Sequence, residues 1–200
     1  MRRLAAVAVA VAVVLVAGCG DDAEPAPAAD GDVDPSEVTA VAIEDGIDLG
    51  ADGPRSASGR VTLPGFEEIA VEVTDQAGDV VEWCLLLAAA AEQYTQGLMS
   101  VTDLGEYAGM LFDFPEGERT GGFWMKDTAL PLSIAYLDAD GGIVSTADMD
   151  PCIGRGDDCP SYPPEGPYED TVEVVQGGLD DLGLDGPDAR LVATGACSPV

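Results

Sequence analysis

The stretch from Leu130 to Asp150, LPLSIAYLDADGGIVSTADMD, carries the clearest fold signal in the chain. One apolar-rich run extends from Pro131 to Asp138 and a second run extends from Ile143 to Asp148. Between them lies DADGG, whose Asp and Gly residues favour a tight turn. DADGG lacks the further ligands and the closing Glu of an EF-hand calcium loop, so we interpret it as a turn. The stretch therefore predicts a β-hairpin.

Short strands separated by Gly and Pro continue on both sides of this hairpin. Alternating or apolar runs predict strands over residues 69–75, 79–88, 109–114, 123–128, 170–177 and 190–197. The run 79–88 is apolar on both faces, which favours a central strand. Residues 88–99 change period and favour a short helix that ends at Gly97. We expect a mainly β (α+β) fold, namely a small compact barrel- or sandwich-like antiparallel sheet with one or two short helices.

The N-terminus has the layout of an export signal. Arg2 and Arg3 precede an uncharged apolar run, and small residues then lead to Cys19. The run is well short of the roughly 20 residues that a membrane-spanning helix needs. Val16-Ala17-Gly18-Cys19 resembles a bacterial lipobox, in which the cysteine is lipidated; the alternative is an ordinary signal peptide with an incidental cysteine. We expect residues 1–18 to be a lipoprotein signal peptide, and the mature protein to be extracytoplasmic, anchored to the outer face of the cell membrane through lipid on Cys19.

The segment after Cys19 differs in composition from the rest of the chain. Residues 20 to about 60 are rich in Asp, Ala, Pro and Gly, and the first aromatic residue is Phe66. Such a segment cannot bury enough apolar surface to offset the entropy of ordering. We therefore expect a disordered acidic tether over residues 19–60 and one β-rich domain over residues 61–200.

The four remaining cysteines fit an exported domain. Four cysteines allow three pairings. Of these we favour Cys152–Cys159, which closes a short segment, and Cys84–Cys197, which ties the C-terminal end to an early strand. Their spacings are not those of paired CxxC zinc ligands, and the chain contains no histidine. Disulfide bonds are therefore a better interpretation than a metal site.

Charge and missing motifs exclude several classes of function. Without Arg2 and Arg3, six of the eight basic residues remain against 38 acidic ones, a formal net charge of −32. Such a field repels nucleic acid, so we expect no nucleic-acid partner. Because histidine is absent, Ser-His-Asp and Cys-His nucleophiles are impossible. No dinucleotide, P-loop or HExxH motif occurs, so we predict no cofactor and no catalytic residue.

Several segments, taken in order, resemble one protein family. They are QGLM (96–99), GMLFDF (109–114), FWMKDT (123–128), LPLSIAYLDADGGIV (130–144) and, more weakly, VEVVQGGLDDLGL (172–184). Together they resemble the prokaryotic domain of unknown function 192 family, also called uncharacterised protein family 0127, over residues from about 68 to 197. Ser133 stands where many members carry Asp, and 148–168 resembles an insertion that holds one cysteine pair. The resemblance implies a fold and a secreted or lipid-anchored protein, but no mechanism.

FWMKDT contains Lys126, the one lysine of the chain. In an extended strand, Lys126 would share a face with Trp124 and Thr128, opposite Asp127. The ammonium group would then lie over Trp124 and pair with a carboxylate, for which the candidates are Asp113, Asp138, Asp148 and Glu173. This structural ion pair is one interpretation.

In the other interpretation, FWMKDT forms a ligand pocket. Its polar rim would be Lys126, Asp127 and Thr128, and its floor Trp124, Met110 and Phe112. Such a site suits a small anionic or carbohydrate-like ligand. A catalytic lysine would need a lowered pKa, which the surrounding carboxylates oppose.

Three functions follow from these observations. The first is a binding or interaction module at the cell envelope, with an unknown small molecule or envelope component as partner. The second is an envelope-associated hydrolase that uses a pocket at Lys126 and Asp127. The third is copper handling by thioethers, for which four methionines are candidates: Met99, Met110, Met125 and Met149. Methionines more often fill gaps in a core, so we assign no metal ligand.

Overall fold

The computed structural model describes residues 46–200. The predicted signal peptide, Cys19 and the first part of the predicted tether lie outside the described residues. Within the part of the chain that is described, no helix is long and apolar enough to cross a membrane.

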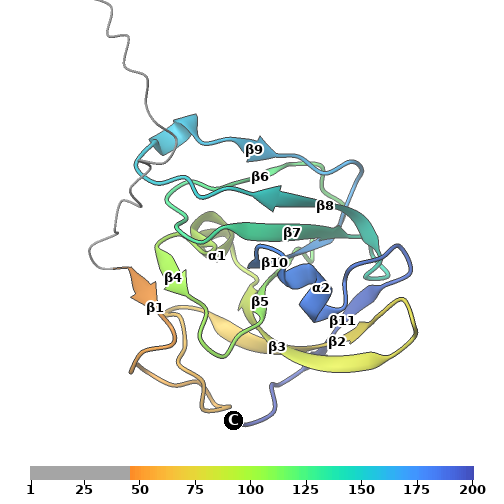
Figure 1. Ribbon diagram of the computed structural model, residues 1–200, viewed down its shortest axis with the longest axis horizontal. Helices are drawn as coiled ribbons and strands as arrows, with labels where there is room; N and C mark the ends of the chain where they lie inside the picture. Colours follow the sequence, from red (N-terminus) through yellow and green to blue (C-terminus); the bar gives the residue numbers. More distant parts are fainter. Residues whose placement is uncertain (1–45) are drawn as a thin grey trace, which may run out of the picture. The chain divides into compact units, whose positions relative to one another are not determined.

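A seven-stranded sheet forms the centre of the domain (Figure 1). From edge to edge its strands are β11 (Arg190–Gly195), β2 (Glu67–Thr74), β3 (Val80–Ala88), β5 (Gly109–Asp113), β10 (Asp170–Val175), β7 (Leu132–Leu137) and β8 (Ile143–Met149). All neighbours are antiparallel except β3 and β5. The prediction that the run 79–88 forms an interior strand is confirmed, because β3 lies between β2 and β5.

The predicted hairpin is β7 and β8. Asp138 fixes its turn, because one carboxylate oxygen accepts the backbone N–H groups of Asp140 at 2.9 Å and Gly142 at 2.8 Å. Gly141 has a φ of +75°, and a Cβ there would lie 2.0 Å from the carbonyl oxygen of Leu191. Only glycine meets both conditions without strain. DADGG is therefore a turn, as its composition predicts.

Each face of the sheet carries its own core. Strand side chains alternate between the faces, so β10 gives Val172 and Val174 to one face and Thr171 and Glu173 to the other. The valine face packs against α2 (Gly178–Leu182) through Leu179 and Leu182. The opposite face is the larger core and is the one that positions the candidate site.

Six small elements contribute to this larger core or border it. They are α1 (Ala91–Gln96), the parallel pair β1 (Ile47–Asp48) and β4 (Val101–Asp103), the antiparallel pair β6 (Phe123–Trp124) and β9 (Ser161–Tyr162), and a 3-10 turn, η2 (Gly156–Asp158). The predicted short helix before Gly97 is confirmed as α1. Leu49 is only 3 % exposed within this core, so the packed chain begins before the predicted boundary at residue 61.

The architecture is mainly β and sandwich-like, and the large sheet does not close into a barrel. A single isolated bridge, Gly142 to Arg190, joins the turn before β8 to the first residue of β11. Of the two expected architectures, the barrel is therefore not formed. Both favoured disulfide bonds are present, Cys84–Cys197 and Cys152–Cys159.

Candidate functional site

The FWMKDT segment leaves the strand conformation after two residues. Phe123 pairs with Tyr162 and Trp124 with Ser161, and there β6 ends. Asp127 then adopts a φ of +51°, and the N–H of Thr128 donates to the carbonyl of Met125 at 3.1 Å. The predicted strand over 123–128 is wrong beyond Trp124, because a turn replaces the ladder. Strict alternation of side chains across this segment therefore does not hold.

Tyr136 fixes the β6–β9 pair to the central sheet. Its hydroxyl donates to the carbonyl of Tyr162 and accepts the N–H of Phe123 at 3.3 Å. Burial raises the pKa of Tyr136 to about 12, so the hydroxyl keeps its proton and remains a donor. One buried side chain thus sets where Phe123 and Trp124 lie.

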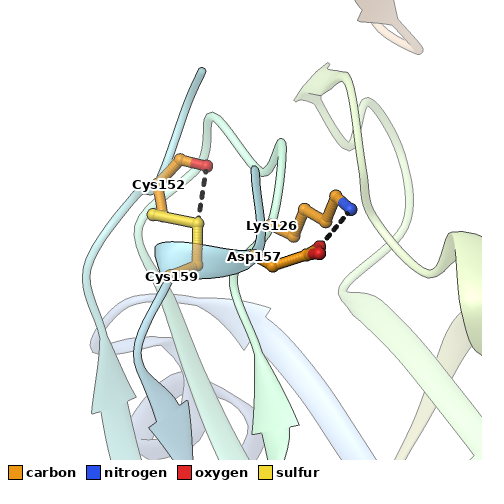
Figure 2. Close-up of polar contacts among 4 residues, drawn as sticks. All are labelled: Lys126, Cys152, Asp157 and Cys159. Carbon is orange, nitrogen blue, oxygen red and sulfur yellow. Dashed lines mark hydrogen bonds and ion pairs between the residues drawn. A yellow bond between two sulfur atoms is a disulfide. The ribbon is translucent and has the colours of Figure 1, made fainter. Parts of the chain in front are cut away.

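Lys126 forms an ion pair with Asp157 (Figure 2). Its ammonium nitrogen lies 2.8 Å from Asp157 Oδ1 and 5.1 Å from the centre of the Trp124 ring. The predicted contact with Trp124 is confirmed. The hydrogen bond to Asp157 raises the pKa of Lys126, and the same bond lowers the pKa of Asp157. Lys126 therefore stays charged and is not a general base.

The carboxylate that pairs with Lys126 is not among the four candidates from the sequence. Asp157 lies in η2, inside the loop that Cys152–Cys159 closes. Lys126 and Thr128 each form a bridge with Cys152, which brings this loop against FWMKDT. We call residues 150–162 the rim segment. The prediction of Asp113, Asp138, Asp148 or Glu173 as partner is wrong, because the rim segment reaches Lys126 instead.

A small cavity of about 30 Å³ opens between α1 and β6. Three of the predicted pocket residues line it, namely Phe112, Trp124 and Thr128, whereas Met110, Lys126 and Asp127 do not. The other lining residues are Tyr94, Thr95, Gln96, Gly97, Leu98, Met99, Phe123 and Glu173. The cavity therefore lies on the side of Trp124 that faces α1, and not at Lys126, where the sequence predicts the pocket.

Glu173 is the unexpected member of this lining. It lies on β10 opposite Met110 and Ile134, and only 4 % of it is exposed. Burial raises its pKa to about 8. Within residues 46–200 its carboxyl group makes no hydrogen bond and no ion pair. A neutral carboxylic acid therefore lines the cavity at pH 7.

Thr171, two residues earlier on the same face of β10, is also fully buried, and its Oγ1 has no partner in the described part of the chain. From the sequence, Glu173 was predicted only as a partner for Lys126. The sequence DTVEVV contains a signal for this burial, because Thr171 and Glu173 alternate with valines along one strand. In the structure both edges of this strand are paired and both faces are packed, so the polar side chains are buried too.

Other candidate groups give weaker sites. Met110, Met125 and Met149 are fully buried in the larger core, where they fill space between strands. Glu68 lies close to the sulfurs of Cys84 and Cys197, but these sulfurs form a disulfide bond and cannot act as thiolate ligands.

A larger cleft of about 650 Å³ lies near α2 and the β7–β8 hairpin. Ser133 Oγ donates to Asp148 at 2.5 Å and accepts the N–H of Gly177 at 2.9 Å there, so its polar groups are satisfied. Further carboxylates, Glu165, Asp180 and Asp185, line the same cleft.

The fold and the cavity define a small β-rich domain with one buried carboxylic acid, and comparison with known proteins gives its family. Residues 72–190 match the model of DUF192, described as "Uncharacterized ACR". The chain belongs to this family, as its sequence motifs predict. No curated protein matches it.

The solved structures similar to this chain include two proteins. A protein from Sinorhizobium meliloti 1021, described as a "putative transcription regulator", is 26 % identical with a TM-score of 0.55, over 66 % of this chain and 98 % of that one. A protein of unknown function from Novosphingobium aromaticivorans DSM 12444 is 24 % identical with a TM-score of 0.55, over 72 % of this chain and 94 % of that one. The second likeness is a likeness of fold alone.

Proposed function

We propose that this protein is an extracytoplasmic small-molecule binding module, anchored to the outer face of the cell membrane through Cys19. The ligand would occupy the cavity between α1 and β6. The observation that carries this proposal is Glu173, a buried carboxyl group that faces the cavity and makes no hydrogen bond within residues 46–200. Buried polar groups are nearly always paired, because burying one without a partner costs about 1–3 kcal/mol.

The size of the cavity limits what enters it. A cavity needs roughly 10–15 Å³ for each water molecule, so about 30 Å³ holds a group of about two heavy atoms. Whole small molecules occupy pockets of about 300–1,000 Å³. A ligand would therefore insert one end towards Glu173 and leave its body outside.

Trp124 offers a surface for that body. It lines the cavity and is 41 % exposed, which is unusual for a side chain of its size. An indole ring can stack on a flat or apolar ligand and leave polar groups in water. The ammonium group of Lys126 lies beside the Trp124 ring and stays paired with Asp157, so the ligand need not contact the lysine.

The expected location agrees with two features of the chain. The N-terminal residues have the pattern of a lipoprotein signal. Disulfide bonds persist in oxidising compartments outside the cytosol, and two occur here. The description of the Sinorhizobium meliloti protein as a regulator of transcription does not extend easily to this chain, because a formal net charge of −30 repels DNA.

An enzyme is the second candidate function, and Glu173 is the observation that favours it. A carboxyl group that keeps its proton at pH 7 can act as a general acid. Hydrolysis of a glycoside needs a second carboxylate nearby, and Glu173 is the one acidic residue among those that line the cavity. Lys126 and Asp127 lie outside this lining, so the predicted hydrolase site at these residues gains no support. Binding is the function that the geometry supports better.

A fragment screen on the full chain tests the proposal. The Trp83→Phe variant leaves Trp124 as the one tryptophan, so its emission reports on the cavity. We expect fragments that change this emission in the Trp83→Phe background to lose their effect when Glu173→Gln is added. Glu165→Gln, in the other cleft, is the matched control. If Glu173→Gln and Glu165→Gln behave alike for every fragment, the cavity is not the binding site.

The anchoring part has a separate test. Metabolic labelling with an alkyne fatty acid should mark the wild-type protein and leave Cys19→Ala unlabelled. An unlabelled wild-type protein would contradict lipidation.

A further inference from the structure

Three hydroxyl groups around the cavity present acceptors rather than donors. Thr128 donates its hydroxyl proton to the carbonyl of Lys126 at 3.2 Å, and Thr95 donates to the carbonyl of Ala91 at 3.0 Å. The hydroxyl of Tyr94 donates to the carbonyl of Asp113 at 2.6 Å. With these protons in use, each oxygen has only lone pairs left for a ligand. These hydroxyls therefore suit a ligand that brings its own donors, and the side-chain amide of Gln96, which also lines the cavity, has an acceptor as well as donors.

The remaining walls favour a positive charge. Phe112, Phe123 and Trp124 line the cavity, and the faces of aromatic rings attract cations. The last residue of α1, Gln96, and the turn that follows it, Gly97 to Met99, also line it, and the C-terminal end of a helix carries carbonyl acceptors with a partial negative charge. No lysine or arginine lines the cavity.

From these contacts we infer that the cavity takes the primary ammonium group of an alkylamine, which displaces the proton of Glu173 and pairs with the resulting carboxylate. The inference rests on the proposed function and names the class of its ligand. A CH₂–NH₃⁺ end has two heavy atoms, which fits the volume derived above, and it brings three donors to an acceptor-rich site. The rest of the amine would lie along Trp124.

The number of protons released on binding distinguishes an ammonium group from a neutral ligand. Before binding, the carboxyl group is neutral, because burial raises the pKa of Glu173 to about 8. When the ammonium group enters, Glu173 releases one proton to solvent and the charges form a buried pair. A neutral alcohol would instead bind the protonated acid and release nothing. An anion would meet a field of the same sign.

No other charged group of the described chain faces Glu173 from the elements packed against it, so none can pair with its carboxylate in place of the ammonium group. From β5, Glu173 faces Met110 and Phe112, which do not titrate. From β7 it faces Ile134 and Tyr136, whose pKa lies at about 12. From α1 the cavity receives Tyr94, whose pKa is raised by burial, and from β6 it receives Phe123 and Trp124. The proton that leaves on binding must therefore come from Glu173.

Isothermal titration calorimetry of the full chain tests this inference with n-propylammonium as the probe. Titrations at pH 7 in phosphate and in Tris differ in heat by the number of protons released multiplied by the difference between the ionisation enthalpies of the two buffers. We expect about one proton per ligand, and a Kd about tenfold lower at pH 7.5 than at pH 6.5, because the ionised fraction rises about tenfold per pH unit below the pKa. Glu173→Gln should weaken binding at least tenfold and abolish the proton release.

Three controls set the outcomes apart. 1-Propanol lacks the charge, tetramethylammonium lacks the N–H donors, and Glu165→Gln removes one carboxylate from the larger cleft. Equal binding of 1-propanol, absence of proton release, or weakening by Glu165→Gln instead of Glu173→Gln would each overturn the inference. If the binding of neutral fragments still depends on Glu173, the proposed function stands without this inference. If no probe changes the emission of Trp124, both the proposed function and this inference fail.

Discussion

The central sheet and the rim segment each contain one disulfide bond and one ionisable group near the candidate site. Cys84–Cys197 ties β3 of the sheet to the chain just beyond β11, 113 positions away, and Glu173 is buried in the sheet without a partner in the described chain. In the rim segment, Cys152–Cys159 joins residues 7 positions apart, and Asp157 is exposed and paired with Lys126. The sheet thus has a long-range disulfide bond and a carboxyl group whose burial is unfavourable. The rim segment has a short-range disulfide bond and an ion pair exposed to water. From this difference we expect the sheet to contribute more to stability than the rim segment, and we propose that ligand binding depends mainly on the sheet through Glu173.

Removing the disulfide bond of the sheet should have the largest effect. In the loop-entropy account, a bond across 113 residues stabilises the folded chain by about 4–5 kcal/mol. We expect the Cys84→Ser/Cys197→Ser variant to lose about this much free energy of unfolding in chemical denaturation. An effect no larger than that of Cys152→Ser/Cys159→Ser would remove the distinction between the two regions.

Glu173 should make stability depend on pH. Its pKa is about 8 in the folded protein, against an ordinary value of 4.5 for a solvated glutamate. Below pH 4.5 both the folded and the unfolded state hold the proton; as the pH rises towards 8, only the unfolded chain releases it, and the folded state loses stability. We expect the wild type to lose on the order of 4 kcal/mol over this range relative to Glu173→Gln.

Chemical denaturation at pH 4, 6 and 8 measures this difference. Glu165→Gln, measured in parallel, should follow the wild type because it changes the same type of side chain in the open cleft. Parallel pH profiles for the wild type and Glu173→Gln would show that the buried carboxyl group does not control stability.

Opening the rim disulfide should cost less and act locally. A loop of this length contributes about 2–3 kcal/mol in the same account. We expect the Cys152→Ser/Cys159→Ser variant to lose that amount and to shift the ¹⁵N–¹H signal of the Trp124 indole, because Asp157 no longer holds Lys126 beside the ring. The indole of Trp83, on β3, is the internal control. Equal shifts of both signals would point to a global change.

The same contrast explains what the sequence could predict. The β7–β8 hairpin depends on local alternation and on Asp138 and Gly141 in its turn, so the pattern is sufficient. The pair of Lys126 and Asp157 depends on how the rim segment folds back, which no local pattern encodes. The alternation of 170–177 predicts a strand with one polar face, but tertiary packing covers that face at Glu173. Most elements and both cysteine pairs were therefore predictable from the residues, whereas the partner of Lys126 and the burial of Glu173 were not.

The ion pair of the rim should contribute least, since Asp157 is 85 % exposed and water screens the pair. We expect Lys126→Ala and Asp157→Ala each to lower Tm slightly, and the coupling between them, measured as a double-mutant cycle, to disappear in about 1 M salt, where the Debye length is about 3 Å. Lys126→Arg should keep the coupling, because the charge remains. The coupling should also fade as the pH drops through the lowered pKa of Asp157, since its protonation removes the charge. A coupling that persists in high salt would show that the rim pair is shielded from solvent as Glu173 is, and the contrast between the two regions would no longer hold.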